Sequence, residues 1–238
     1  MGNLSYRDLY YRWESEQWAT GTIDLSNDKR QWDEELSTEA KHRFGSALTP
    51  SRLLVEGVTQ TLVPFVDAAP TEEHQVFLAT QLVDGARHAV FYELFDRDVL
   101  GEEGTEMTAR LGRFDDVNPA FRALAVEMLP AAADRIRRDP ADLGAFIEGV
   151  VLYHLIIVGR VALPGQHLLL DWAREAALLP GFSQGLTAIA RDGSRHVAFG
   201  QRFLEEATER DGRWTDVIDK KLEELTPIAL EAIQFATA

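Results

Sequence analysis

Apolar residues recur along this chain at steps of three and four positions, which is the spacing of a helix with one buried face. In the run from residue 52 to 65, one stripe is formed by Val55, Val58, Leu62 and Phe65. The sequence holds neither a sustained alternation of apolar and polar residues nor a tight hairpin signal, the two patterns that indicate strands. We therefore expect an all-α fold.

Capping residues and prolines predict where the helices begin and end. We expect helices to begin near Ser37, after Thr71 and at Asp139–Pro140, and we expect Pro50 to interrupt or kink the first of them. A further long helix is expected at about 183–207. Four long helices with several accessory ones are typical of a bundle that has a long crossover connection.

The chain is expected to form one domain over residues 1–238, because no stretch rich in proline, glycine or serine divides it. Residues 1–35 show no sustained helical period, so we expect them to form an N-terminal arm packed on the bundle. Trp13, Trp18 and Trp32 are its natural anchors, since large aromatic side chains gain the most from burial.

One fifteen-residue stretch occurs twice, as QLVDGARHAVFYELF from Gln81 and as IARDGSRHVAFGQRF from Ile189. Each copy predicts a helix, and a residue three positions before a histidine shares its face. That residue is Gly85 in the first copy and Gly193 in the second, although glycine inside a helix costs roughly 1 kcal/mol relative to alanine. The molecule is therefore expected to contain two related helix pairs.

The charge of the chain excludes some classes of partner. A net charge of -15 argues against a nucleic acid or an anionic membrane, which would require a basic surface. The chain has no cysteine, so disulfides and thiolate chemistry are excluded. The N-terminus does not resemble a signal peptide, and the apolar run from Val150 to Val158 is too short to cross a bilayer. We expect a cytoplasmic protein.

Two histidines on duplicated helices are half of a known metal-binding arrangement. In bundles that bind two metal ions, a carboxylate precedes a histidine by three residues on each of two helices, and the other two helices supply one carboxylate each. The carboxylates balance the charge of a dinuclear iron or manganese centre, and neutral imidazoles complete it. This chain has His88 and His196 but has glycine at both paired positions.

Several segments resemble, in order and spacing, the ferritin-like ligand-binding oxidases built on the fold of the ribonucleotide reductase small subunit. The similar segments are TIDLSNDKRQWDEELSTE, VEGVTQTLVPF, DGARH, YHLIIVGRVALPG and LLPGFSQGLTAIARDGSRHVAFG. They cover the chain from about Trp18 to its last helix. The resemblance implies a ferritin-like four-helix bundle with accessory helices.

Carried over residue by residue, the resemblance retains both histidine ligands and loses all four carboxylates. The carboxylate positions of the family fall on Val55, Gly85, Val158 and Gly193. Two imidazoles alone leave the charge of a metal pair unbalanced. We therefore expect no metal and no other cofactor.

The lost carboxylates leave volume at the centre of the bundle. An empty space costs on the order of 24 cal/mol per Å3, so aromatic side chains or a ligand should fill it. The resemblance implies a long-chain apolar ligand. We expect the pocket to be lined by Val55, Val58, Gly85, Val158 and Gly193. In the family, the equivalents of Val58 and Tyr153 become covalently joined through metal and oxygen chemistry, a link that we do not expect here.

Three roles are open for the histidines. In related bundles an aspartate bonds the histidine of the other copy, so Asp84 and Asp192 are expected to hold His196 and His88 as structural pairs. The same contact could create an acid–base pair, and Tyr153 is a further catalytic candidate. Alternatively, both histidines and an aspartate could hold a single metal ion.

Four other side chains have ordinary structural roles in this interpretation. His154, next to Tyr153 in an apolar helix, is expected to be a satisfied core or interface residue. Glu148 lies nearly three helical turns before Val158, one of the positions at which the family places a metal ligand, so a role in the site is not favoured. Arg87 and Arg195 are expected to form ion pairs on the surface or at the ends of the bundle.

Three hypotheses for function follow. The first is a metal-free homologue of dinuclear oxidases whose bundle cavity binds an apolar small molecule, with or without transforming it. The second is a non-catalytic structural or regulatory partner of an active relative. The third, disfavoured by the lost ligands, is a metal-dependent oxidase or reductase subunit that uses Glu56 and the two aspartates instead. The resemblance also implies a homodimer.

Overall fold

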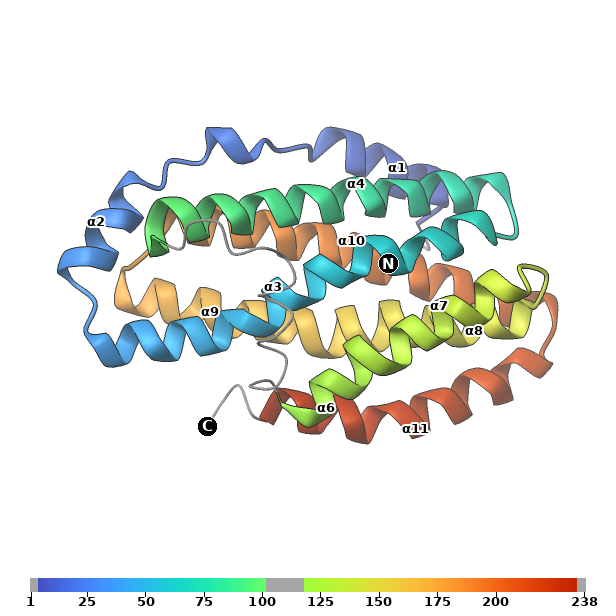
Figure 1. Cartoon of the computed structure of the whole chain (residues 1–238). Coiled ribbons are helices and arrows are strands. Elements are labelled where there is room, and N and C mark those ends of the chain that lie inside the picture. The colour runs from blue at the N-terminus through green and yellow to red at the C-terminus, as the bar shows by residue number, and fades with distance from the viewer. Residues whose placement is uncertain (1–3, 102–117, 235–238) are drawn as a thin grey trace.

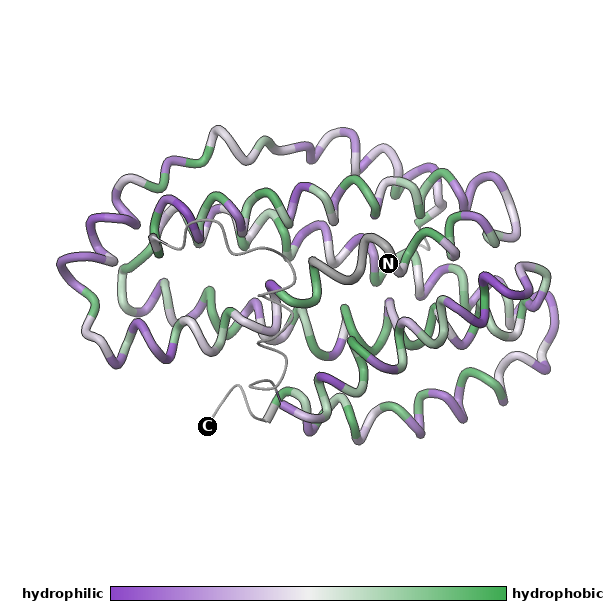
Figure 2. Tube along the Cα trace, viewed as in Figure 1, coloured by the Kyte–Doolittle hydropathy of each residue, from purple (hydrophilic) through white to green (hydrophobic). Residues whose placement is uncertain are grey.

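The computed structural model describes residues 4–101 and 118–234, with the side chains of residues 56–60 and 234 left out of the description. Throughout these residues the regular structure is helical and no strand occurs, so the all-α prediction is confirmed. Along each helix, hydrophobic and hydrophilic positions alternate in patches (Figure 2), as expected for helices that bury one face.

Four long helical segments form the bundle (Figure 1). The first two are α3 (Thr38–Asp67) and α4 (Glu72–Phe95), which pack against each other. The third is a continuous helix made of α8 (Leu143–Val150), η5 (Val151–Ala162) and α9 (Leu163–Ala176). The fourth, α10 (Pro180–Arg210), packs against η5, α9 and α4.

Shorter elements cover the bundle. The arm holds α1 (Tyr6–Ser15), η1 (Thr20–Thr22) and α2 (Ser26–Glu34), and it runs along the outside of α4 and α10 (Figure 1). The remaining elements are η2 (Asp96–Leu100), α6 (Pro119–Arg122), η4 (Ala123–Met128), α7 (Leu129–Arg138) and α11 (Arg213–Gln234). Of these, α11 packs on η5, while α7 packs on α3.

Two predicted helix boundaries differ from the structure. Of the two effects expected of Pro50, an interruption does not occur, because Leu48 and Leu53 on either side of it are buried in the core and outweigh the loss of one N–H donor. The third long helix does not begin at Asp139–Pro140. It begins at Leu143, where the Asp142 side chain accepts a hydrogen bond from the amide of Ala145.

The helix from Leu143 to Ala176 is long and apolar enough to cross a membrane. However, 67% of its most apolar window is buried inside the bundle, as in the central helix of a soluble protein. The apolar character of this helix is therefore explained by packing. Its middle part, η5, has the wider turns of a π-helix, a geometry that is frequent at functional sites.

Candidate functional site

The two copies of the repeat lie on α4 and α10, which contact each other in the bundle. Asp84 and His88 are one helical turn apart on α4 and are both buried, as are Asp192 and His196 on α10. We call these four residues the His–Asp layer. All of the catalytic candidates from the sequence except Tyr153 belong to it.

The aspartates and histidines bond in a crossed pattern. Nε2 of His196 lies 3.0 Å from Oδ2 of Asp84, and Nε2 of His88 lies 2.9 Å from Oδ2 of Asp192. Each aspartate thus holds the histidine of the other copy, as the sequence predicted. The two bonds tie α4 to α10 at the centre of the molecule.

Arg195 joins the two halves of the layer. Its guanidinium donates to Oδ1 of Asp192 at 2.6 Å and to Oδ2 of Asp84 at 3.3 Å. The prediction that Arg195 lies at the surface or an end of the bundle is wrong, because the residue is only 4% exposed. Two buried carboxylates attract the guanidinium inward. Its Nη1 donates to Oε2 of Glu16, a residue of the arm, at 2.7 Å.

The arm closes the layer from outside. The indole of Trp13 donates to Oδ1 of Asp84, and the indole of Trp18 donates to Oδ2 of Asp192, both at 2.9 Å. Trp18 also stacks on the ring of His88, with 6.3 Å between ring centroids. The sequence predicted these tryptophans as anchors. It did not reveal that each one binds an aspartate of the repeat.

Arg87, the counterpart of Arg195 in the first copy, remains half-buried. It donates to Gln17 of the arm and lies over the ring of Trp18, 5.6 Å from its centroid. Its distance of 3.4 Å from Oδ1 of Asp84 makes that ion pair weaker than those of Arg195. The repeat is therefore symmetric in its histidines and aspartates but asymmetric in its arginines.

The network keeps the carboxylates ionised. Burial alone would raise the pKa of Asp84, but the hydrogen bond from His196 and the nearby positive charges outweigh burial and lower it. The pKa of Asp192 is lowered in the same way, with His88, Trp18 and Arg195 outweighing burial. Burial lowers the pKa of His88, so this imidazole is neutral at neutral pH and its Nε2–H donates to Asp192.

The donor set of the layer does not fit a dinuclear metal centre. Protein groups already engage all four oxygens of Asp84 and Asp192. The family's carboxylate positions hold valine and glycine, which offer no side-chain ligand. Within the part of the chain that the structure describes, no group of three or more His, Cys, Asp or Glu residues could hold a metal ion. The side chain of Glu56 lies outside that part.

Side chains occupy at least one of the vacated positions. A Cβ atom at Gly193 would meet Leu163 at 3.3 Å and Val158 at 3.5 Å. Val158 is 6% exposed and is part of the buried hydrophobic core. Val55 is half-buried and packs against a separate apolar cluster that includes Phe44, Phe91 and Phe95. Gly85 is buried as well, and the side chain of Val58 lies outside the described residues.

The polar side chains of the long central helix have separate surroundings. Tyr153 is buried, and burial, followed by the nearby charge of Asp84, raises its pKa. His154 is fully buried with Nε2 3.1 Å from Oε1 of Gln81, in line with a core role. Glu148 binds Arg135 at 3.0 Å on the rim and takes no part in the layer.

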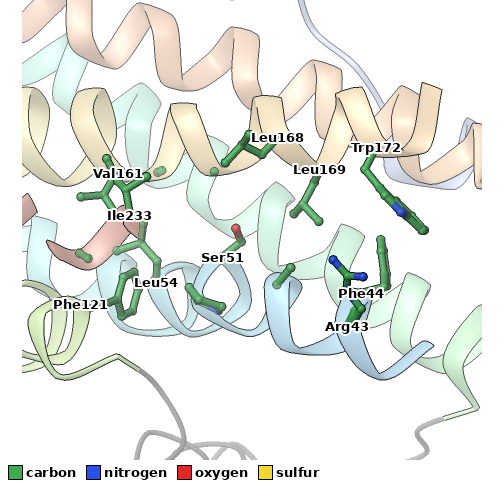
Figure 3. A pocket seen from close by; sticks show the side chains of 15 residues that line it. Arg43, Phe44, Ser51, Leu54, Phe121, Val161, Leu168, Leu169, Trp172 and Ile233 are labelled. Atoms are coloured by element: carbon green, nitrogen blue, oxygen red, sulfur yellow. The ribbon is translucent and has the colours of Figure 1, made fainter. Parts of the chain in front are cut away.

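A pocket of about 330 Å3 opens between α3, α9, α6 and α11 (Figure 3). Arg43, Phe44 and Trp172 lie at one end, Phe121, Val161 and Ile233 lie at the other, and Ser51 lies between them (Figure 3). Of the predicted pocket residues whose side chains are described, none lines this pocket. Two of its lining residues lie close in sequence to positions that the resemblance assigns to carboxylates, since Leu54 precedes Val55 and Val161 is three residues after Val158.

Comparison with known families gives a match over almost the whole chain. The family described as "Ribonucleotide reductase, small chain" matches residues 5–234. The matched range includes all of the segments that carry the resemblance.

Solved structures of an R2-like ligand-binding oxidase share the fold. A variant with an anaerobically reconstituted Mn/Fe cofactor has a TM-score of 0.86 and 23% identity, over 98% of this chain and 86% of that chain. An aerobically reconstituted Mn/Fe variant gives 0.87 and 23%, over 98% and 80%. The ferritin-like fold predicted from the sequence is therefore confirmed.

Proposed function

Because this chain belongs to the ribonucleotide reductase small chain family, we propose that it uses the family's bundle to bind an apolar small molecule and works without the family's dinuclear metal centre. The observation that carries the proposal is the pocket between α3 and α9. Its volume of about 330 Å3 lies at the lower end of the range of roughly 300 to 1,000 Å3 that is common for small-molecule sites.

The chemistry of the pocket indicates the class of ligand. Most of its walls are aliphatic or aromatic, which favours an apolar molecule. Its polar side chains are Arg43 and Ser51, with the indole nitrogen of Trp172 near the Arg43 end (Figure 3). An apolar body with one anionic or hydrogen-bonding group matches this distribution.

The proposal concerns binding first. The His–Asp layer does not line the pocket, and its aspartates are held by protein donors. If the bound molecule is transformed, the available groups are the imidazole nitrogens that do not face an aspartate. A neutral His88 whose Nε2–H donates to Asp192 presents Nδ1 as a base.

Filling the pocket tests the proposal. Gly165 lines it, and a Cβ atom there would meet no atom within 4 Å, so Gly165→Phe places a ring in the pocket without a backbone clash. We expect Gly165→Phe to weaken binding of the fluorescent probe anilinonaphthalene sulfonate at least about tenfold, equivalent to about 1.4 kcal/mol. Mass spectrometry of solvent-extracted protein should also show the loss of any co-purified ligand.

Gly45→Phe is the matched control. Gly45 lies on α3 with no atom within 4 Å of an added Cβ, and it does not line the pocket. This variant should bind the probe as the native chain does. Equal binding by the native chain and Gly165→Phe, or absence of both probe binding and co-purified ligand, would contradict the proposal.

One observation favours a second candidate, the non-catalytic partner of an active relative. Leu163 and Val158 pack against the position of Gly193, which reduces the space in which a substrate could approach the His–Asp layer. This candidate predicts that Gly165→Phe leaves the biological activity unchanged. Assays of both variants in cells that lack the native chain therefore separate the two candidates.

A further inference from the structure

His74 is a buried histidine that takes no part in the His–Asp layer. It lies in the first turn of α4 and is 2% exposed, and neither of its ring nitrogens forms a hydrogen bond. The ring of Tyr6, from α1, meets it edge-on with 4.5 Å between ring centroids. Phe203, from α10, lies at 5.1 Å in a similar arrangement. The imidazole is therefore enclosed by aromatic rings from two other helices.

The charged groups around His74 do not compensate for its burial. Oε2 of Glu206 lies 3.6 Å from its Nε2, too far for a hydrogen bond, and instead accepts one of 2.7 Å from the hydroxyl of Tyr6. Arg210 pairs with the other carboxylate oxygen of Glu206. Burial lowers the pKa of His74, although the charges of Glu206 and Glu73 oppose the shift, and Arg210 adds to it. The imidazole is thus neutral at neutral pH.

The helix that covers His74 is held by few side chains. Of the ten residues of α1, Tyr6 and Leu9 are buried. A helix of this length is marginal in water, so α1 depends on its contact with the bundle. The next part of the arm is held separately, by Glu16 on Arg195 and by Trp18 on Asp192. A segment with so few buried contacts opens locally at a lower free energy than the whole protein unfolds.

We propose that α1 is a pH-sensitive strap, which protonation of His74 releases from the bundle. Opening removes Tyr6 from the imidazole and admits water, so the pKa returns toward about 6.5. The open form therefore binds more protons than the docked form. Docking is at full strength above pH 6.5 and weakens as the pH falls below it. Trp13 leaves with α1, which breaks its bond to Asp84 and uncovers that side of the His–Asp layer.

Thiol labelling measures the opening, because the chain has no native cysteine. Leu9 is 0% exposed, so a cysteine at this position reacts with dithiodipyridine only when α1 opens. The rate in Leu9→Cys, divided by that of the same thiol in the urea-unfolded chain at the same pH, should rise roughly tenfold from pH 7.5 to 5.5. Ala145→Cys, buried on α8, reports global unfolding and should react much more slowly at both pH values.

Two histidine variants in the Leu9→Cys chain identify the titrating group. His74→Phe keeps a ring in place and should make the normalised rate nearly independent of pH. His42→Phe, at an exposed position of α3, should retain the tenfold rise. A constant rate in Leu9→Cys overturns the proposal, as does a rise that survives His74→Phe. A slower rate at pH 5.5 also overturns it, since protonated His74 would then bind Glu206 and hold α1 in place.

Discussion

Arg195 balances the charge at the centre of the bundle. It contacts both aspartates of the His–Asp layer, and the pKa values of these carboxyls are lowered, so both are ionised at neutral pH. The neutral imidazole of His88 adds no positive charge. A single buried guanidinium therefore serves two buried carboxylates.

Arg195→Leu should destabilise the protein strongly. The substitution leaves two buried carboxylates without their shared cation, and breaking such a buried pair costs about 3–5 kcal/mol. Arg87→Leu removes the equivalent arginine of the first copy, which is half-buried, and should cost about 1 kcal/mol or less. Urea denaturation at pH 7 measures both, and equal losses would mean that Arg195 has no special role.

His154 should make stability depend on pH. Burial lowers its pKa from 6.5 to about 3. Below pH 6.5 this histidine binds a proton in the unfolded chain but remains neutral in the folded chain. Its contribution to the free energy of unfolding is therefore complete above pH 6.5 and is lost as the pH falls toward 3. This group alone should reduce the free energy of unfolding by roughly 2 kcal/mol between pH 6.5 and 4.5.

His154→Leu isolates that contribution. The variant loses the contact with Gln81 at every pH, but its free energy of unfolding should change less between pH 6.5 and 4.5 than that of the native chain. Urea denaturation across this range provides the comparison. Parallel pH profiles for the two proteins would show that His154 does not titrate as its burial implies.

The repeat predicted the crossed pairs of the His–Asp layer. It did not predict that one of its two arginines would be buried and the other half-buried. Both copies read Asp-Gly-x-Arg-His, so nothing in the motif distinguishes Arg87 from Arg195. The difference depends on the arm, where Glu16 binds Arg195 and Gln17 binds Arg87. Contacts between residues so far apart in the chain leave no local pattern.

At the scale of elements, the start of α10 depends on a different helix. Its preceding residue, Leu179, has a left-handed backbone, and no side chain of its own caps the helix. Instead Asp28 of α2 accepts hydrogen bonds from the amides of Gly181 and Phe182 at 2.8 and 2.7 Å. A Cβ atom at Gly181 would lie 2.4 Å from the carbonyl oxygen of Asp24, so only glycine permits this approach.

Asp28→Ala should therefore loosen the first turn of α10. We expect a loss of about 2 kcal/mol in the free energy of unfolding, since two amides lose their acceptor and the helix N-terminus loses a negative charge. Asp24→Ala removes an exposed carboxylate that caps only Ser26, and should cost about 0.5–1 kcal/mol. The hydrogen-exchange rates of the Gly181 and Phe182 amides should increase in Asp28→Ala and stay unchanged in Asp24→Ala.

For the whole molecule, the sequence predicted the helical class and the order of the segments, because apolar periodicity and the repeat extend over long stretches. It did not predict the pocket beside Arg43 and Ser51. This pocket is formed by α3, α9, α6 and α11, which are distant in sequence, and its position depends on how their side chains pack. The homodimer and the cytoplasmic location remain predictions.

The arm has a consequence for the order of folding. Trp13 binds a partner 71 residues away and Trp18 binds one 174 residues away, and these partners lie on different helices. Closing such long loops is entropically unfavourable until α4 and α10 already stand side by side. The arm precedes the bundle helices in the chain and yet is among the last segments to dock, so its docking marks a completed bundle.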